Sequence, residues 1–197
     1  MIVGITGNIC SGKSLAAKFL EEKGMKAVYA DKLGHQILEN DPVISAKLAE
    51  AFPGRDIADP DGNIIRKELG RVAFMNKENL EKLNSIIHPV LVPVFMEEIR
   101  NAAKFFNNIA AEAALIFEWK IEDYFDTVIT VTAPPEVRIR RLSESGKISL
   151  ADAEKRVELQ GDDSEKKSRS DFVIENTGTL TGFQERVYEV WEKISAG

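Results

Sequence analysis

The segment from Gly7 to Ser14, with the sequence GNICSGKS, is the feature that most constrains this chain. It fits the pattern GxxxxGK[ST], in which a glycine-rich loop wraps around phosphate groups. The residues before it, Ile2 to Thr6, predict a short buried strand, and Leu15 to Lys23 predict a helix with apolar contacts. A loop between a strand and a helix N-terminus surrounds a phosphate with backbone N–H groups and the positive end of the helix dipole. The segment therefore predicts a nucleoside triphosphate site, with an ordinary glycine-rich turn as the alternative.

Two side chains of this loop have distinct expected roles. Lys13 can bridge β- and γ-phosphate oxygens, and Ser14 can ligate Mg²⁺. The remaining positions that we expect around the nucleotide are Gly7, Asn8, Ile9, Cys10, Ser11, Gly12 and Leu15. A triphosphate and Mg²⁺ are therefore the cofactors that the loop predicts.

Length and charge limit the class of protein. The 197 residues suffice for one α/β domain with small additions. A net charge of −6 argues against nucleic-acid or membrane binding, so anionic small molecules must be met by local clusters of Lys and Arg. The single cysteine, Cys10, fits a reducing compartment, and the start of the chain lacks the features of a signal peptide. We expect a cytoplasmic protein.

Strands and helices are predicted to alternate along the chain. Further strand candidates are 26–30, 109–112, 127–131 and 171–174. Alternation of this kind predicts a parallel sheet whose ligands bind at the carboxyl ends of the strands. The loop, Asp31 and Glu112 all fall at such ends, so we expect them to share one site.

Helical patterns fill most of the interval from Asp31 to about Lys104. We expect interruptions at Asp41-Pro42, in the turn-rich segment 53–63 and at His88-Pro89, where proline is predicted to break the helix. This interval is interpreted as a helical insertion over the strand ends.

The C-terminal part contains three predicted segments. Ser149 to Asp152 resembles a capping box that opens a helix through Leu159, with Arg156 on its exposed side. The polar run from Gly161 to Ser170 predicts a mobile surface segment. Apolar residues at helical spacing between Leu180 and Ile194 predict a terminal helix on the sheet.

Two carboxylates are candidates for the chemistry of the site. Asp31, at the end of the second strand, can face a γ-phosphate beside an acceptor hydroxyl, whereas the alternative is an N-cap of the following helix. Glu112 can hold Mg²⁺ through water or orient a substrate, or it is a solvated strand end.

Among the arginines, Arg138 and Arg141 lie three residues apart on one helical face. We expect Arg141 to point at the phosphates and the others to be solvated, with a plain surface helix as the alternative. Arg156 can act from a lid above the site. The two histidines, His35 and His88, lack the partners that a metal site needs.

Beyond the loop, the chain resembles the dephospho-coenzyme A kinase family. The matching residues occur in order over nearly the whole chain: Ala30-Asp31, Asp61-Gly62 with Arg66 and Leu69, Leu83 with Ile87-His88-Pro89, Leu115 to Glu118, Pro135-Glu136 with Arg141-Leu142, Arg156 with Gln160, Glu165-Lys166 with Arg169, and Asp171 to Ile174 with Asn176 and Gly178.

The resemblance implies ATP-dependent phosphorylation of the 3′-hydroxyl of dephospho-coenzyme A, with Asp31 as the base. It implies that Arg141 and Arg156 contact nucleotide phosphates, that Asn176-Thr177-Gly178 lies near adenine, and that the insertion with Arg66 and His88 receives the acceptor. The catalytic set is then Asp31, Lys13 and Arg141.

The same resemblance implies a three-layer P-loop kinase fold with a five-stranded parallel sheet. It divides a single domain of residues 1–197 into a core of about 1–30, 105–140 and 170–197, a helical acceptor region of about 31–104 and a lid of about 141–169. We expect a monomer or weak homo-oligomer.

The chain departs from the family pattern at several positions. Asn8 and Cys10 replace glycines and Leu15 a threonine, while Ala114 replaces a proline, Glu112 an aspartate, His35 an arginine, Ser145-Gly146 an Arg-Asp pair and Gly161-Asp162 a Met-Pro pair. A cysteine at position 10 must adopt an ordinary backbone region or be strained. Its thiol is either shifted toward thiolate by the positive loop or a small buried hydrophobe.

Three other functions stay open at this point. A different small-molecule or nucleoside monophosphate kinase would share the loop but not the combination of Arg66, His88-Pro89 and Asn176-x-Gly178. A nucleotide-dependent switch would need a guanine-reading motif, which the sequence lacks. A degenerate pseudo-kinase would fit Cys10 and Leu15, although Lys13, Ser14 and Asp31 are present.

Overall fold

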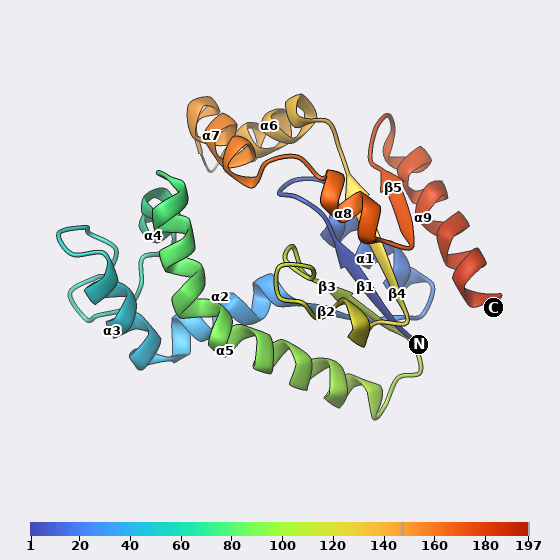
Figure 1. The fold of residues 1–197 in the computed structure, drawn as a ribbon, viewed down its shortest axis with the longest axis horizontal. Helices are drawn as coiled ribbons and strands as arrows, with labels where there is room; N and C mark the ends of the chain where they lie inside the picture. The colour runs from blue at the N-terminus through green and yellow to red at the C-terminus, as the bar shows by residue number, and fades with distance from the viewer. Residues whose placement is uncertain (147, 197) are drawn as a thin grey trace. The chain divides into compact units, whose positions relative to one another are not determined.

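The computed structural model describes residues 1–146 and 148–196. Its strands form one parallel sheet in the order β2-β3-β1-β4-β5 (Figure 1). The strands are β1 (Ile2–Thr6), β2 (Lys26–Tyr29), β3 (Ile109–Glu112), β4 (Thr127–Thr132) and β5 (Phe172–Glu175). The predicted parallel five-stranded sheet is confirmed, with strand ends that differ by one residue at most from the predicted ones.

Strand β1 occupies the centre of the sheet. It pairs with β3 on one side, with Ile5 opposite Glu112, and with β4 on the other, with Thr6 opposite Thr130. Because all strands are parallel, their carboxyl ends meet at one edge, where the loop after Thr6 and Glu112 lie together.

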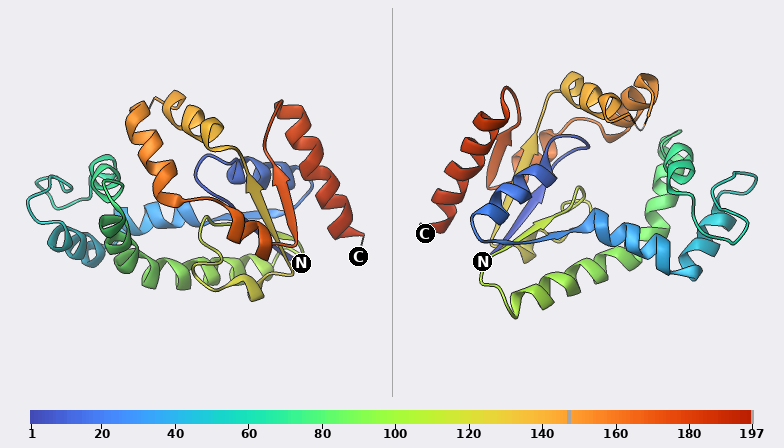
Figure 2. Two further views of the ribbon diagram at one scale, coloured as in Figure 1. Left: turned by 45° about the horizontal axis from the view of Figure 1, so that its top comes forward. Right: turned by 180° about the vertical axis from the view of Figure 1, so that it is seen from behind.

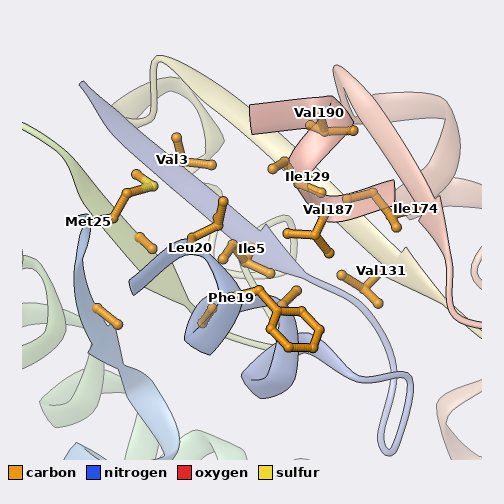
Figure 3. Packing of buried hydrophobic residues seen from close by; sticks show 14 of the residues in the cluster. Val3, Ile5, Phe19, Leu20, Met25, Ile129, Val131, Ile174, Val187 and Val190 are labelled. Carbon is orange, nitrogen blue, oxygen red and sulfur yellow. The ribbon is translucent and has the colours of Figure 1, made fainter. Parts of the chain in front are cut away.

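One face of the sheet is covered by α1 (Lys13–Glu22) and α9 (Leu180–Ser195). The right view of Figure 2 shows α1 in front of the strands and α9 next to β5. The core on this face includes Phe183. Figure 3 labels ten of its other members, which are Val3, Ile5, Phe19, Leu20, Met25, Ile129, Val131, Ile174, Val187 and Val190. Val3 and Ile5 alternate with Gly4, as a strand period of two requires. The predicted terminal helix on the sheet is confirmed.

The opposite face is covered by the segment 113–126, which includes the 3-10 helix η1 (Glu122–Tyr124), and by α8 (Ser164–Arg169). Gly4 faces this layer, where an added Cβ would approach Phe125 Cγ to 2.9 Å and Ile116 Cδ1 to 3.1 Å. Thr130 of β4 donates a hydrogen bond to the carbonyl of Lys166 in α8. The molecule thus has three layers around this sheet, as the resemblance implies.

Helices α6 (Pro135–Glu144) and α7 (Leu150–Gln160) pack against each other. Ser149 caps α7 by accepting a hydrogen bond from the N–H of Asp152, so the predicted start of this helix is confirmed. The Asp152 carboxylate accepts from the Ser149 hydroxyl rather than from its N–H, so only half of a capping box is formed. The prediction of a mobile surface segment over 161–170 is wrong, because this run contains α8 and buries Lys166. A lysine whose ammonium finds acceptors can be buried, which composition alone does not indicate.

The chain divides into two compact units, Met1–Tyr29 with Glu97–Gly197, and Ala30–Met96. The second unit is helical and contains α2 (Ala30–Asn40), α3 (Pro42–Ala51), α4 (Arg66–Ala73) and most of α5 (Lys77–Ala103). Asp41 caps α3 through the N–H groups of Val43 and Ile44, so the predicted interruption there is confirmed. The apolar residues that this unit buries include Ile37, Ile44, Leu48, Phe52, Ile57, Leu69, Val72, Ile87 and Leu91.

The predicted break at His88-Pro89 is wrong. Helix α5 stays helical through Pro89 and Pro93, although its ribbon changes direction along its length in Figure 1. Both prolines are exposed and lie four residues apart on one side, so water can satisfy the carbonyls that lose a donor while Ile87 and Leu91 stay packed. Over residues 1–146 and 148–196, α5 included, no helix combines the length and apolar character that crossing a bilayer requires.

Candidate active site

The loop between β1 and α1 has a backbone that only glycine tolerates at two positions. Gly7 and Gly12 adopt φ values of +140° and +110°. A Cβ on Gly7 would lie 2.1 Å from the carbonyl oxygen of Val131, and a Cβ on Gly12 would lie 2.1 Å from Asn176 Nδ2. Because these neighbours are a strand carbonyl and a buried amide, the two glycines fix the shape of the loop.

A buried charged cluster lies at the start of α1. The Lys13 ammonium donates to the carbonyl of Asn8 at 3.3 Å and lies 3.9 Å from Glu112 Oε1. The Ser14 hydroxyl donates to Glu112 Oε2 at 3.1 Å. Glu112 is only 1% exposed, so its reading as a solvated strand end is wrong. The adjacent carboxyl ends of β1 and β3 hold this carboxylate against the loop.

Arg141 and Asn176 hold the outer side of the loop. Arg141 Nη1 donates to the carbonyls of Cys10 and Ser11 at 3.2 and 3.5 Å, and its Nη2 donates to the carbonyl and the side-chain oxygen of Asn176, both at 3.1 Å. Asn176 Nδ2 donates to the carbonyl of Ser11 at 2.7 Å. These bonds satisfy the carbonyls of Cys10, Ser11 and Asn176. The contact from Asn176 to the loop was not predicted from the sequence.

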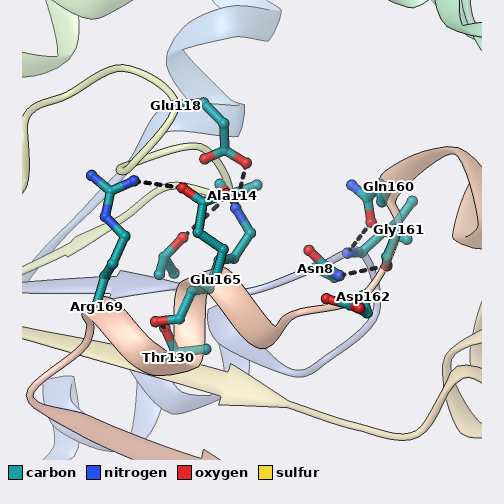
Figure 4. A network of polar contacts seen from close by, with 12 residues as sticks. Asn8, Ala114, Glu118, Thr130, Gln160, Gly161, Asp162, Glu165 and Arg169 are labelled. Carbon is teal, nitrogen blue, oxygen red and sulfur yellow. Dashed lines mark hydrogen bonds and ion pairs between the residues drawn. The ribbon is translucent and has the colours of Figure 1, made fainter.

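A second attachment joins the loop to the end of α7 (Figure 4). The Ile9 N–H donates to Gln160 Oε1 at 2.7 Å, and Asn8 Nδ2 donates to the carbonyl of Gly161 at 3.2 Å. The Lys166 ammonium donates to the carbonyl of Ala114 and to Glu118, two residues that Figure 4 labels. Sequence reasoning gave no role to these contacts, because the partners lie far apart in the chain.

Cys10 adopts a left-handed backbone with φ of +57°, so of the two predicted alternatives the strained one is confirmed. Its side chain is half-buried. Burial raises the pKa of the Cys10 thiol, while the positive charges of Lys13, Arg141 and Arg138 oppose that shift. The burial effect is the larger one, so a thiol shifted toward thiolate is not what the structure shows.

Arg138 contradicts the prediction that only Arg141 leaves solvent. Its side chain is 3% exposed, and burial lowers the pKa of its guanidinium, with Asp163 acting in the opposite direction. Within residues 1–146 and 148–196, its Nε and Nη1 have no hydrogen-bond partner. The helical period correctly places Arg138 on the same face as Arg141. It does not reveal that Asp163 and neighbouring residues lie near that face, because they come from another part of the chain. Arg140 is exposed, as predicted.

The lid and adenine candidates also belong to the unit that carries the sheet. Arg156 lies on α7 and is half-buried rather than exposed as predicted, and burial lowers the pKa of its guanidinium. Gly178 follows β5 with φ of +81°, in the connection that leads from Asn176 to α9.

Three predicted site residues lie in the helical unit. Asp31 is exposed in the first turn of α2, and since that helix begins at Ala30, Asp31 is not its N-cap. Arg66 opens α4, where its Nη2 lies 2.8 Å from His35 Nε2 and its Nη1 lies 3.4 Å from Glu39 Oε1. His88 is half-buried within α5.

Comparison with known proteins decides the family. A family model described as dephospho-CoA kinase matches residues 1–182. The chain belongs to the dephospho-CoA kinase family. The resemblance in its sequence is thereby confirmed, and the protein is a kinase.

Individual relatives agree with this assignment. The chain is 39% identical over 194 residues to a dephospho-CoA kinase of Fusobacterium nucleatum, which covers 98% of each protein. The crystal structure of TT1252 from Thermus thermophilus superimposes with a TM-score of 0.77 at 31% identity, over 100% of this chain and 98% of that one. A shikimate kinase from Bacteroides thetaiotaomicron, at 11% identity and a TM-score of 0.58 over 99% and 98% of the two chains, shares the fold. The P-loop kinase fold is therefore confirmed.

Two departures from the dephospho-CoA kinase pattern have a structural account. Glu112, in place of an aspartate, reaches both the Ser14 hydroxyl and the Lys13 ammonium. Gly161, in the position of a methionine, adopts φ of +69° and presents its carbonyl to Asn8. The loop and its supports are thus complete in this member of the family.

Proposed function

We propose that this protein transfers the γ-phosphoryl group of ATP to the ribose 3′-hydroxyl of dephospho-coenzyme A, giving coenzyme A and ADP. The observation that carries the proposal is the family match over residues 1–182, together with a glycine-shaped loop that brings Lys13, Ser14 and Glu112 into one buried cluster. This reaction completes coenzyme A synthesis, and a cytoplasmic location is part of the proposal.

The triphosphate is assigned to the loop. The loop N–H groups that are not already bonded within the protein, as those of Ile9 and Ser11 are, bind its oxygens, and Lys13 neutralises charge between the β- and γ-phosphates. Arg141 acts from the outer side, where it fixes the carbonyls of Cys10 and Ser11, and Arg156 of α7 supplies a further positive charge. Asn176 and Gly178 border the nucleoside. Because charge spreads over the phosphoryl oxygens in the transition state, fixed cations around them lower the barrier.

The residues at the start of α1 fit Mg²⁺. The Ser14 hydroxyl and the Glu112 carboxylate are hard oxygen donors and lie 3.1 Å apart, which suits an ion that takes few protein ligands and completes its shell with phosphate oxygens and water. We propose Ser14 as the direct ligand and Glu112 as the group that holds a coordinated water. Ser14 and Glu112 would hold the ion, which would supply positive charge to offset that of the phosphates.

The acceptor is assigned to the helical unit. Asp31 takes the proton of the 3′-hydroxyl as its oxygen attacks the γ-phosphorus, and the bond to the β-γ bridging oxygen breaks to release ADP. Arg66 and His88 are proposed to bind the acceptor. The contacts of Arg66 with His35 and Glu39 hold its guanidinium in place for an anionic group.

The test is ADP release in the presence of Mg-ATP with dephospho-coenzyme A, AMP, adenosine or no acceptor. Dephospho-coenzyme A should stimulate release far above the acceptor-free rate, because acceptor binding excludes water from a closed kinase site. AMP and adenosine should be much poorer. Equal rates with AMP would reassign the protein to nucleoside monophosphate kinases, and stimulation by none of the acceptors would contradict the proposal altogether.

A further inference from the structure

The end of helix α7 is attached to the phosphate-binding loop at two points. Gln160, the last residue of α7, accepts a hydrogen bond from the Ile9 N–H at 2.7 Å. Gly161, the next residue, accepts one from the Asn8 side chain at 3.2 Å. Figure 4 shows both bonds side by side. Asn8 is 4% exposed, so its amide group is committed to this contact rather than to solvent.

The same helix carries Arg156 one turn before this attachment. Residues four apart on a helix lie on the same face, so Arg156 and Gln160 are neighbours along α7. A bond that fixes Gln160 on Ile9 therefore also fixes the distance of Arg156 from the loop. Arg141 of α6 is attached to the next part of the loop, at the carbonyls of Cys10 and Ser11, and α6 packs on α7.

We infer that Gln160 is a positioning residue for the nucleotide. By holding α7 on the Ile9 N–H, it keeps Arg156 against the triphosphate. The inference rests on the proposed function in that the ligand is Mg-ATP and Arg156 contacts its phosphates. Gln160 itself is a neutral acceptor and contributes no charge.

An alternative arrangement has the opposite consequence. In this alternative, the Ile9 N–H is needed by a phosphate oxygen, and Gln160 merely occupies it in the absence of nucleotide. Nucleotide binding would then have to displace the Gln160 side chain. The second bond, from Asn8 to Gly161, favours a lasting attachment, because Gly161 with φ of +69° ends α7 at this point and its carbonyl is satisfied by the loop.

Positioning by Gln160 and blocking by Gln160 predict opposite changes in the dissociation constant for Mg-ATP. Gln160→Met removes the acceptor oxygen while keeping a long side chain of good helix propensity. Titration calorimetry with Mg-ATP, without acceptor, should give a dissociation constant about five- to tenfold higher than that of the unaltered protein, because α7 is no longer held on the loop and Arg156 loses part of its charge-assisted contact with the phosphates. A lower dissociation constant would show that Gln160 blocks a phosphate position and would overturn the inference.

A double-mutant cycle separates positioning of Arg156 from general support of the loop. In an Arg156→Ala background, Gln160→Met should change the dissociation constant by less than about twofold, because the residue that it positions is gone. An equal loss in both backgrounds would overturn the inference. Gln36→Met, the same substitution at an exposed position of α2, serves as the control and should leave binding unchanged.

Two further measurements keep the result interpretable. Circular dichroism reports whether the variants fold, and hydrogen exchange of the Ile9 amide should be faster in Gln160→Met than in the unaltered protein, since its acceptor is lost. Unchanged exchange would contradict the bond itself. If the unaltered protein does not bind Mg-ATP, the proposed function fails, whereas binding without coupling between positions 156 and 160 defeats this inference alone.

Discussion

Asp31 stands in the first turn of α2, where an exposed carboxylate stabilises the helix by about 0.3–1 kcal/mol. Replacement by asparagine therefore has two separable effects, a small loss of stability and the loss of a base. We expect Asp31→Asn to lower kcat with dephospho-coenzyme A by about 10²-fold or more and to leave Mg-ATP affinity nearly unchanged. Steady-state kinetics with calorimetric titration measure both quantities. A near-normal kcat per folded molecule would show that Asp31 only stabilises its helix.

Cys10 offers a test of the electrostatic balance at the tip of the loop. Only the thiolate reacts with maleimide, and a raised pKa lowers the thiolate fraction at any given pH below it. Since burial raises the pKa of Cys10, alkylation at neutral pH should be slower than that of a small peptide thiol, and the rate should keep rising at pH values where the peptide has reached its plateau. Mg-ATP should slow the reaction further. Fast alkylation at neutral pH would mean that Lys13 and the arginines outweigh burial.

At the scale of single residues, the sequence indicated which residues belong to the site better than it indicated what surrounds each of them. The loop pattern located Lys13, Ser14 and the two glycines, because their spacing is local. The bonds from Gln160 and Asn176 join residues more than a hundred positions apart, and Arg138 is buried beside Asp163, which lies outside its own helix. Such contacts depend on which elements pack together, which local periodicity does not contain.

At the scale of elements, α5 shows where the sequence pattern and the fold disagree. Proline in a helix interior removes one hydrogen bond and crowds the preceding turn, at a typical cost of about 3 kcal/mol, and this rule predicted a break. The helix continues because Ile87 and Leu91 are buried on its packed side while Pro89 and Pro93 are exposed. Tertiary packing thus overrides a local penalty. The strands were predictable to within a residue at their ends, since short apolar runs bounded by turns identify buried parallel strands.

This explanation predicts a stabilising substitution. Pro89→Ala restores an N–H donor for the carbonyl of Ser85 and should raise the free energy of unfolding by about 1–2 kcal/mol, less the entropy that proline removes from the unfolded chain. Urea denaturation measures the change. Pro42→Ala is the control, because Pro42 is the first residue of α3, where no donor is needed, and its replacement should bring no gain. A loss of stability in Pro89→Ala would show that the helix needs the geometry that proline imposes.

At the scale of the whole molecule, a net charge of −6 coexists with a site for two anionic substrates. The structure reconciles the two by local placement of cations, with Lys13 at the start of α1, Arg141 of α6 bonded to the loop, and Arg156 on α7. Composition predicted this need for local cations. It could not predict that one arginine of the same group, Arg138, is buried with two nitrogen atoms that lack a partner in residues 1–146 and 148–196.

The central position of β1 in the sheet also affects folding during synthesis on the ribosome. β1 is made first, yet its neighbours in the sheet are β3, from Ile109, and β4, from Thr127. Both edges of the strand stay unpaired while the intervening residues leave the ribosome, and such edges are prone to aggregation. Pairing over this sequence distance is slow. The nascent protein therefore carries the complete sequence of its phosphate loop long before it has a loop that can bind phosphate.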